Sequence, residues 1–281
     1  MNVSFSRDNV LKSFRSDMRK RVYKGGVLTP ESFSTRFGRR AVFGMIHLGA
    51  LPGSPLFRSL DAVTAAALDD ARAIRDGGCD GFVLENYGDR PFTRGRVEAE
   101  TVAAMTRVIA EVAREVRIPF GVNVLRNDAL SALAIAAATG AAFIRVNVHT
   151  GAMVTDQGII EGDAYTTLRR RAALAPEVLI FADYLVKHAT PMGEVSVHDL
   201  RERGLADAII VTGTATGAAA DPSRLREVRA AVDAPLLLGS GLTADNAHLF
   251  EADGAIVGTS LKVDGRVDAG RVRAVVEAFK S

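Results

Sequence analysis

The sequence has very little cysteine: Cys79 is the only one among 281 residues. A single thiol excludes an intrachain disulfide and any metal site built from several cysteines. Cys79 stands directly before an apolar run, so we expect it to be a buried structural thiol. Any chemistry must therefore be sought among other residue types.

The sequence also lacks an excess of charge, because 35 basic residues nearly balance 33 acidic ones. A formal net charge of +2 gives no global reason to expect nucleic acid or a membrane surface as a partner, so any anion site must be local. No run approaches the roughly 20 apolar residues of a membrane span, and residues 1–26 lack the apolar core of a secretion signal. We therefore expect a cytoplasmic protein without membrane insertion or nucleic-acid binding.

The first 40 residues differ in character from the rest of the chain. They are basic, and Val10, Leu11, Phe14 and Met18 recur at helical spacing. We expect residues 1–40 to form a helical extension and residues 41–281 to form one domain. An oligomer contact or a lid is the alternative role for the extension.

From residue 41 onward, short runs of valine, isoleucine, leucine and phenylalanine alternate with longer segments of helical period. This alternation indicates repeated βα units. Eight units over about 240 residues match an α/β fold of the (β/α)8 TIM-barrel type, whereas a doubly wound sheet more often stops at five or six strands. The predicted strands are 41–47, 80–85, 118–124, 142–148, 178–183, 207–212, 235–240 and 254–259. The predicted helices lie near 60–76, 95–116, 128–139, 164–174, 196–203, 222–231, 243–250 and 268–279.

A polar residue ends each predicted strand. These residues are His47, Glu85, Asn123, Asn147, Asp183, Thr212, Ser240 and Thr259. If the strands are parallel in one barrel, these side chains converge on one rim, which is where such barrels place their chemistry.

The last two units carry glycine-containing turns, GSGLTADNA at 239–247 and GTSLKVDG at 258–265. Backbone N–H groups, hydroxyl side chains and the N-terminus of a short helix can hold a phosphate there, and glycine permits the close approach. The TGTATG segment at 212–217 is a third small loop near the same place. The alternative is that these segments are only turns. The predicted phosphate-binding residues are Gly213, Gly239, Ser240, Gly241, Gly258, Thr259 and Ser260.

Strand periodicity places Arg145 on the same face as Asn147, one layer lower inside the barrel. A buried guanidinium needs an anionic partner, and Glu85 and Asp183 are the candidates. We expect one of these acids to be paired structurally and the other to be free as a general base. The sequence leaves open which acid takes which role.

His47 ends the first strand, where a histidine can shuttle protons near neutral pH or merely hydrogen-bond the backbone. Lys187 follows the fifth strand and could neutralise a phosphate or an enolate, or lie solvated on the surface. The sixth strand ends at Thr212 instead of lysine, which disfavours a Schiff-base aldolase. His47, Glu85 and Asp183 could bind a divalent ion, but no local ligand spacing supports a metal, and no cofactor is evident.

A long loop follows the fourth strand at 149–165, and it carries Asp156, Gln157, Glu161 and Asp163 among glycines. Loops of this length on the active face are typically lids or substrate clamps. With the rim residues included, the predicted substrate-binding residues are Asn123, Arg145, Asn147, Asp156, Lys187 and Thr212.

The most distinctive segments are MIHLGALPGSP (45–55), GFVLENYGDRPF (81–92), GVNVLRND (121–128), FIRVNVHTGAMVTDQGIIEG (143–162), FADYLVKHA (181–189), VTGTATG (211–217) and the two turns within 239–265. Over about residues 41–265 they resemble the BtpA/SgcQ family. The resemblance implies a ribulose-phosphate-binding-like barrel. The family is named after a member linked to photosystem I biogenesis, and other members occur beside sugar-metabolism genes. Another member carries a nucleoside-triphosphatase label, which no Walker A loop in this sequence supports.

Our leading hypothesis is a barrel that binds a phosphorylated sugar or phosphoribosyl compound and acts as an isomerase, epimerase or lyase. Glu85 or Asp183 would be the base, His47 the acid, and Asn123 and Asn147 hydrogen-bond donors. One alternative is a non-catalytic assembly or stability factor that docks a partner through the basic extension, and a second is a nucleoside or nucleotide-sugar hydrolase. The alanine-rich helical segments are compatible with a homo-oligomer.

Overall fold

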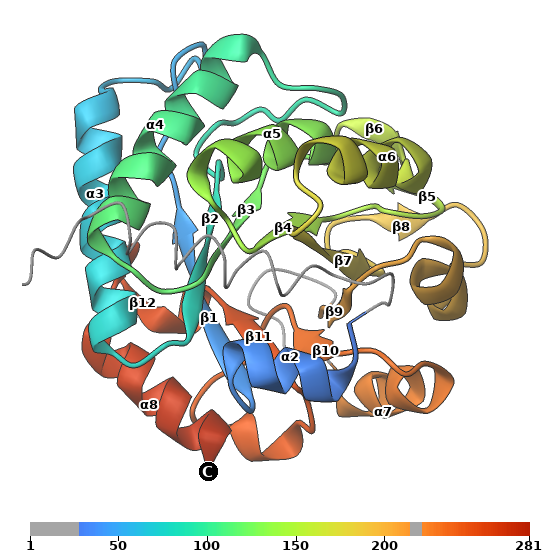
Figure 1. The fold of residues 1–281 in the computed structure, drawn as a ribbon. Coiled ribbons are helices and arrows are strands. Elements are labelled where there is room, and N and C mark those ends of the chain that lie inside the picture. Colours follow the sequence, from blue (N-terminus) through green and yellow to red (C-terminus); the bar gives the residue numbers. More distant parts are fainter. Residues whose placement is uncertain (1–27, 214–220) are drawn as a thin grey trace, which may run out of the picture.

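The computed structural model describes residues 28–213 and 221–281, and within these ranges eight parallel strands close into a barrel (Figure 1). The barrel strands are β1 (Ala41–His47), β2 (Gly81–Glu85), β3 (Phe120–Asn123), β4 (Phe143–Val146), β7 (Leu179–Tyr184), β9 (Ala208–Val211), β10 (Leu236–Leu238) and β11 (Gly254–Val257). Around the barrel they follow the order β1-β11-β10-β9-β7-β4-β3-β2. The predicted (β/α)8 barrel is confirmed.

Helices surround the strands on the outside of the barrel (Figure 1). They are α3 (Leu60–Asp76), α4 (Ala99–Glu115), α5 (Ala129–Thr139), α6 (Ala164–Leu174), α7 (Pro222–Ala231) and α8 (Ala269–Lys280). Helices α3, α5 and α8 begin at Ser59, Asp128 and Asp268, whose side chains each accept a hydrogen bond from a first-turn backbone N–H. Helix α5 ends at Gly140, whose φ of 81° is a left-handed conformation that glycine adopts without strain.

Two of the predicted helices differ from the structure. The segment predicted near 196–203 contains a π-helix, η1 (Asp199–Arg203). The α-helix predicted at 243–250 is wrong, because only the short 3-10 helix η2 (Ala247–Leu249) forms there. Thr243 and Asn246 bond each other's backbone N–H groups through their side chains, so this segment forms a polar turn instead of a helical one.

The long segment after β4 is an ordered hairpin. Strands β5 (Ala152–Thr155) and β6 (Gly158–Glu161) pair antiparallel, and β8 (Thr190–Pro191) from the loop after β7 adds a third strand. Met153 and Ile160 of this hairpin are buried in a small apolar cluster with Val148 and Val186. The hairpin is therefore anchored on the barrel, and its use as a substrate clamp stays a prediction.

Alternating side chains along each strand divide the apolar core into two parts. Val42 and Ile46 of β1 pack outward against the helices, whereas Phe43 and Met45 point into the barrel. The interior is apolar at the strand N-terminal ends and polar toward the C-terminal ends. Strand β4 illustrates the change, because Phe143 is followed two positions later by the buried Arg145.

A further helix, α2 (Pro30–Phe37), closes the barrel at the N-terminal ends of the strands. A capping box between Thr29 and Ser32 starts the helix, with Pro30 at its first position. Phe33 and Phe37 are buried among the interior phenylalanines, and the Phe37 ring centroid lies 5.4 Å from that of Phe43. Residues 28–37 thus complete the barrel core, while the predicted helix around residues 10–18 lies outside the described residues.

The one cysteine is buried, as the sequence indicates. Burial and the neighbouring Asp80 raise the pKa of the Cys79 thiol to about 12. The thiol therefore stays protonated at neutral pH and has a packing role.

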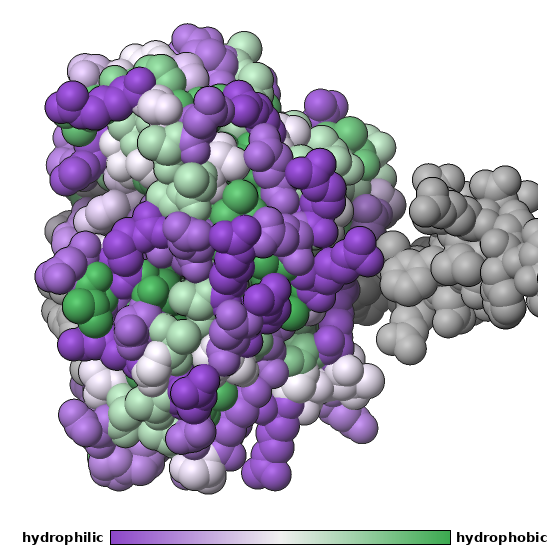
Figure 2. All heavy atoms as spheres, turned by 90° about the vertical axis from the view of Figure 1, so that its left-hand side faces the viewer, coloured by the Kyte–Doolittle hydropathy of each residue, from purple (hydrophilic) through white to green (hydrophobic). Residues whose placement is uncertain are grey.

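The outer surface is predominantly polar on the side that Figure 2 shows, where apolar side chains are scattered among charged ones. Among the described residues, no helix combines the length and apolar character needed to cross a membrane.

Replacing Phe37 with alanine tests the role of α2. We expect Phe37→Ala to lower the free energy of unfolding by about 3–5 kcal/mol, because it leaves a cavity under the barrel interior. Denaturant unfolding measures the loss. Tyr165→Ala, which truncates an aromatic ring that is 66% exposed, is the matched control and should cost less than about 1 kcal/mol. Equal losses in the two variants would contradict a plugging role for α2.

Candidate active site

Polar side chains from neighbouring strands meet inside the barrel at the strand C-terminal ends. Strand register places Glu85 beside His47 of β1 on one side and beside Asn123 of β3 on the other. Asn147, just after β4, and Asp183 of β7 continue the same ring through hydrogen bonds. The closed barrel therefore brings these residues together, as the sequence predicts.

Arg145 and Asp183 form a buried ion pair. The guanidinium donates through Nε and Nη2 to the two carboxylate oxygens of Asp183, each at 3.1 Å. Asn147 adds a third donor at 2.7 Å to Oδ2. The two charged side chains are 3% and 0% exposed, so each depends on the other for compensation. Asp183 is thus the acid that pairs with Arg145. The sequence left open whether Asp183 or Glu85 takes this role.

Asn123 connects this pair to the next strand. Its amide nitrogen donates to the Arg145 carbonyl at 3.2 Å and to Asn147 Oδ1 at 3.1 Å. Its own Oδ1 is buried and has no partner among the described residues. An unpaired buried acceptor is costly, so this oxygen is suited to receive a hydrogen bond from a bound molecule or from a protonated neighbour.

Glu85 is the second acid and lies in a different environment. Among the described residues its carboxyl makes no hydrogen bond, and His47 Nε2 lies 3.8 Å from its Oε1. Burial raises the pKa of Glu85, while Arg145 and Lys187 oppose the rise through their positive charge. Glu85 therefore has a stronger tendency than an exposed glutamate to carry a proton, which is the condition that suits a group that must both give and take one.

His47 is held between two partners. Its Nδ1 lies 2.8 Å from Lys262 Nζ, and its ring stacks on Tyr87 with centroids 4.4 Å apart. Burial, with Lys262, Lys187 and Arg145 nearby, lowers the pKa of His47 to about 3. At neutral pH the imidazole is consequently uncharged and can donate one hydrogen bond but cannot act as an imidazolium.

The inward-facing positions directly after β10 and β11 are glycines, Gly239 and Gly258. A Cβ atom at Gly239 would lie 2.5 Å from Thr212 and 3.7 Å from an Arg145 nitrogen, and one at Gly258 would lie 3.8 Å from His47 Cε1. Because side chains alternate, Ser240 and Thr259 come one position later and do not join the central ring. The ring of polar side chains therefore has a gap on this side of the barrel.

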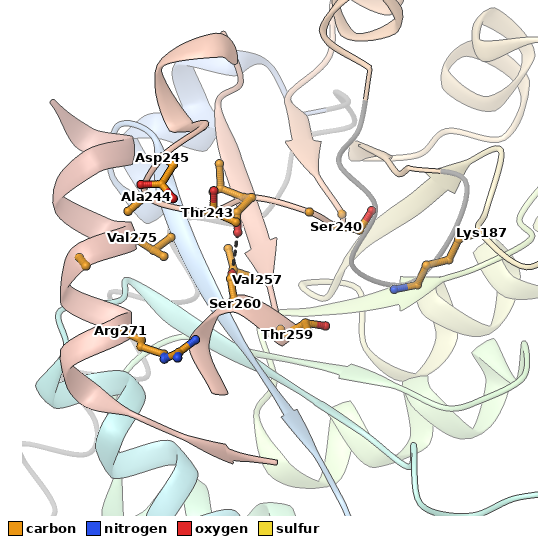
Figure 3. Close-up of a pocket in the computed structure, with 15 residues that line it drawn as sticks. Lys187, Ser240, Thr243, Ala244, Asp245, Val257, Thr259, Ser260, Arg271 and Val275 are labelled. Atoms are coloured by element: carbon orange, nitrogen blue, oxygen red, sulfur yellow. Dashed lines mark hydrogen bonds between the residues drawn. The ribbon is translucent and has the colours of Figure 1, made fainter. Parts of the chain in front are cut away.

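A pocket of about 460 Å³ lies at this gap. Figure 3 shows its walls: Ser240 and Thr259 follow β10 and β11, Arg271 and Val275 come from α8, and Lys187 reaches in from the loop after β7. Burial lowers the pKa of Lys187, whose charge acts on both Glu85 and Asp183. Lys187 thus links the pocket to the polar ring.

Ser240 and Ser260, which line the pocket, have hydrogen-bond partners of their own. Ser240 Oγ accepts a hydrogen bond from the Gly213 backbone at 2.8 Å, and Ser260 Oγ donates to the Leu242 carbonyl at 2.6 Å. Thr259 is exposed and begins the short 3-10 helix η3 (Thr259–Leu261). Gly241 also lines the pocket, but the α-helix expected to point at a phosphate here is missing. Phosphate binding by these residues stays a prediction.

Asp156 does not lie with the other predicted site residues. It is exposed at the turn between β5 and β6, where it accepts a hydrogen bond from the Gln157 side chain. Thr212 lies next to the ring, and its hydroxyl donates to the Leu185 carbonyl at 3.1 Å. Residues 214–217 of the third predicted loop lie outside the described residues. Within the described ranges, no three histidine, cysteine or acidic side chains are grouped so that they could hold a metal ion.

Three residues of the site escape sequence analysis. Lys262 and Arg271 come from beyond the last strand, and Tyr87 follows β2. The only sequence signal for Lys262 is its place in the GTSLKVDG turn. A side chain that reaches the site from outside the strands follows no strand periodicity, so the alternation that found the ring could not find it.

Comparison with known proteins identifies the family. The sequence profile of the BtpA family matches residues 38–281. The chain belongs to the BtpA family. An uncharacterized protein of Archaeoglobus fulgidus is 47% identical over 244 residues, which cover 86% of this chain and 99% of that protein. The photosystem I biogenesis protein BtpA of Synechocystis is 46% identical over 262 residues, with 88% and 90% covered.

Solved structures with a similar fold are more distant in sequence. N-(5′-phosphoribosyl)anthranilate isomerase from Pyrococcus furiosus superposes with a TM-score of 0.53 at 13% identity, covering 85% of this chain and 98% of that one. Orotidine 5′-phosphate decarboxylase from Pyrococcus horikoshii gives a TM-score of 0.51 at 14% identity, with 85% and 99% covered. At this identity the likeness establishes the barrel fold of this BtpA-family protein and nothing of its chemistry.

Removing the charge of Asp183 tests the buried pair. We expect Asp183→Asn to lower the free energy of unfolding by about 3–5 kcal/mol, because Arg145 is left as an uncompensated buried charge. Denaturant unfolding at neutral pH measures the loss. Asp156→Asn, which removes the same charge at an exposed turn, should change stability by less than about 0.5 kcal/mol. A loss at Asp183 no larger than that control would contradict the pairing.

Glu85→Gln tests the protonation of the second acid. A carboxyl whose pKa is higher in the folded than in the unfolded protein stabilises the fold fully below the unfolded pKa of about 4.5, and this stabilisation is lost as the pH rises. The loss is about 1.4 kcal/mol per pH unit while the folded state alone keeps the proton. Glutamine keeps the shape without the charge. We therefore expect the variant to gain stability over the wild type as pH rises from about 4.5 to 7. Thermal unfolding at several pH values measures this gain, and a gain that shrinks with pH would contradict it.

Proposed function

We propose that this BtpA-family protein binds a small phosphorylated metabolite, a sugar phosphate or a phosphoribosyl compound, and rearranges it by acid–base chemistry. The observation that supports the proposal is the pocket beside Gly239 and Gly258. His47 and Lys187 connect it to Glu85, whose carboxyl makes no hydrogen bond with the described residues. A phosphate would lie against the two glycine turns. The reacting carbon atoms would lie over the centre of the barrel.

The charges around the barrel mouth favour an anionic ligand. Arg145, Lys187 and Arg126 all act on Glu85, and Lys262 acts on His47. Asp183 neutralises Arg145, which leaves Lys187, Arg126 and Lys262 as the other cations near the barrel mouth. These cations are complementary to a phosphate dianion.

Glu85 is the proton-transfer group in this proposal, and His47 donates a hydrogen bond. In its ionised form Glu85 would remove the proton from the hydroxyl-bearing carbon next to the substrate carbonyl and return it to the carbonyl carbon. The proton of that hydroxyl group would pass to the former carbonyl oxygen, so that no atom is gained or lost. The developing negative charge lies on the carbonyl oxygen, and the neutral Nε2–H of His47 would stabilise it. Asn123 Oδ1 would accept a hydrogen bond from a substrate hydroxyl. Asp183 would hold Arg145 in place and would not act as the base.

Ligand screening tests the proposal. We expect the Tm of the purified full chain to rise with pentose phosphates, hexose phosphates or phosphoribosyl compounds, because a ligand specific to the folded state stabilises it by mass action. Thr259→Asp places a negative charge in the pocket and should reduce the Tm rise to the level without ligand. Thr166→Asp adds the same charge near the start of α6, across the barrel, and should keep the full rise. No rise with any phosphorylated compound would overturn the proposal.

The name of the Synechocystis relative favours one other function, an assembly factor. In that case the barrel would be a scaffold and the basic extension would contact the partner. Charge reversal at Lys12, Arg15, Arg19 and Lys20 would then abolish function while Glu85→Gln would leave it intact. Our proposal expects the opposite sensitivity.

Hydrolysis of a nucleoside or nucleotide sugar uses the same residues in a different way. Glu85 would then activate a water molecule instead of removing a proton from carbon. Product analysis with the ligand that raises the Tm would separate the two reactions, since hydrolysis releases two molecules and isomerisation releases one.

A further inference from the structure

The contact between Lys262 and His47 joins two distant parts of the chain. Lys262 begins β12 (Lys262–Val263), which pairs with β13 (Arg266–Val267) in a small hairpin after η3. Its Nζ lies 2.8 Å from His47 Nδ1, on the side of the ring opposite Nε2. The Nε2 atom lies 3.8 Å from Glu85 Oε1. Lys262, His47 and Glu85 thus follow one another from the hairpin into the barrel interior, each next to the one before.

The hairpin that carries Lys262 is held against helix α3. The Val267 backbone N–H and the Arg266 side chain both reach Asp70 Oδ1 of α3, each at 3.1 Å. Leu261, directly before Lys262, is fully buried. The lysine therefore approaches His47 from a rigid support, and its own side chain is partly buried.

The chemistry of the two groups determines where the imidazole proton lies. A lysine ammonium has three hydrogen-bond donors and no acceptor. Its partner nitrogen on His47 must then be the unprotonated one, which leaves the proton on the other ring nitrogen. We propose that Lys262 is a positioning residue that donates to His47 Nδ1 and thereby holds the imidazole proton on Nε2, directed toward Glu85.

Other charged groups lie near His47 and Lys262. Glu85 of β2, Arg145 of β4 and Lys187 after β7 act on His47 in addition to Lys262. Burial lowers the pKa of Lys262, Asp70 of α3 and Glu85 oppose this through their negative charge, and Arg266 of β13 adds to it. Lys187 and Arg145 favour the neutral imidazole through their charge alone. Lys262 differs from them because it contacts a ring nitrogen and so selects one of the two neutral tautomers.

The consequence for the site is a prearranged hydrogen-bond donor. With the proton on Nε2, a substrate oxygen placed between His47 and Glu85 meets an N–H on one side and a carboxyl group on the other. The catalytic use of this donor rests on the proposed function. The position of the proton does not, since it follows from the contact within the unliganded protein.

Nitrogen NMR of the unliganded full chain tests the proposal. In the uniformly ¹⁵N-labelled protein, long-range ¹H–¹⁵N spectra distinguish protonated from unprotonated ring nitrogens, and His47→Gln identifies the His47 signals by their loss. We expect Nδ1 to be unprotonated and Nε2 to be protonated from about pH 5 to about pH 8. Wild-type His47 with its proton on Nδ1 would overturn the proposal, and this measurement requires no variant at Lys262.

Two matched variants separate the hydrogen bond from the charge. Lys262→Met removes both, so we expect the two nitrogens to show a mixture of tautomers and the pKa of His47 to rise. Lys187→Met removes a nearby charge without a contact to the ring. It should raise the pKa of His47 and leave the proton on Nε2.

The outcomes of this experiment are independent of the ligand screen. A tautomer change in Lys187→Met as large as that in Lys262→Met would overturn the positioning role. A wild-type proton on Nε2 that shifts only in Lys262→Met supports it, even if no phosphorylated compound raises the Tm. A failed ligand screen would therefore remove the proposed function without removing this inference.

Discussion

The buried pairing of Arg145 with Asp183 is the constraint around which the polar half of the barrel is organised. A guanidinium that is 3% exposed cannot lie in an apolar interior without an anion, so it fixes the carboxylate of the neighbouring strand β7. Asn147 and Asn123 complete the hydrogen bonds of the pair and extend it to β3. The N-terminal half has no such demand, and it is filled by the phenylalanines that α2 covers.

The same pairing gives the two acids different characters. Asp183 accepts three hydrogen bonds, two of them from the Arg145 guanidinium, whereas Glu85 accepts none from the described residues and has its pKa raised by burial. Two carboxyl groups with such different surroundings can serve different purposes within one site. Gly239 and Gly258, directly after β10 and β11, carry no side chain into the polar ring, and the pocket lies on that side of the barrel.

Strand alternation predicted much of this arrangement. It placed Arg145 inside the barrel and indicated that an acid must pair with it. It could not choose between Asp183 and Glu85, because the choice depends on the register of β4 against β7. That register sets Arg145 opposite Phe181, two residues before Asp183, so the guanidinium reaches Asp183 along the strand. The pattern of one polar residue at each strand end also assigned Ser240 and Thr259 to the rim, although the inward positions there belong to the glycines before them.

The sequence by itself determined the eight βα units, the family and the residue types at the strand ends, because these depend on local periodicity and on motifs that are read in order along the chain. Tertiary structure alone decided which groups touch. Lys262 is separated from His47 by 215 positions and lies on a hairpin that strand periodicity does not cover, so only the closed barrel brings the two together. The 3-10 turn at 247–249 was likewise decided by side-chain hydrogen bonds between Thr243 and Asn246, which compete with the helix that composition favours.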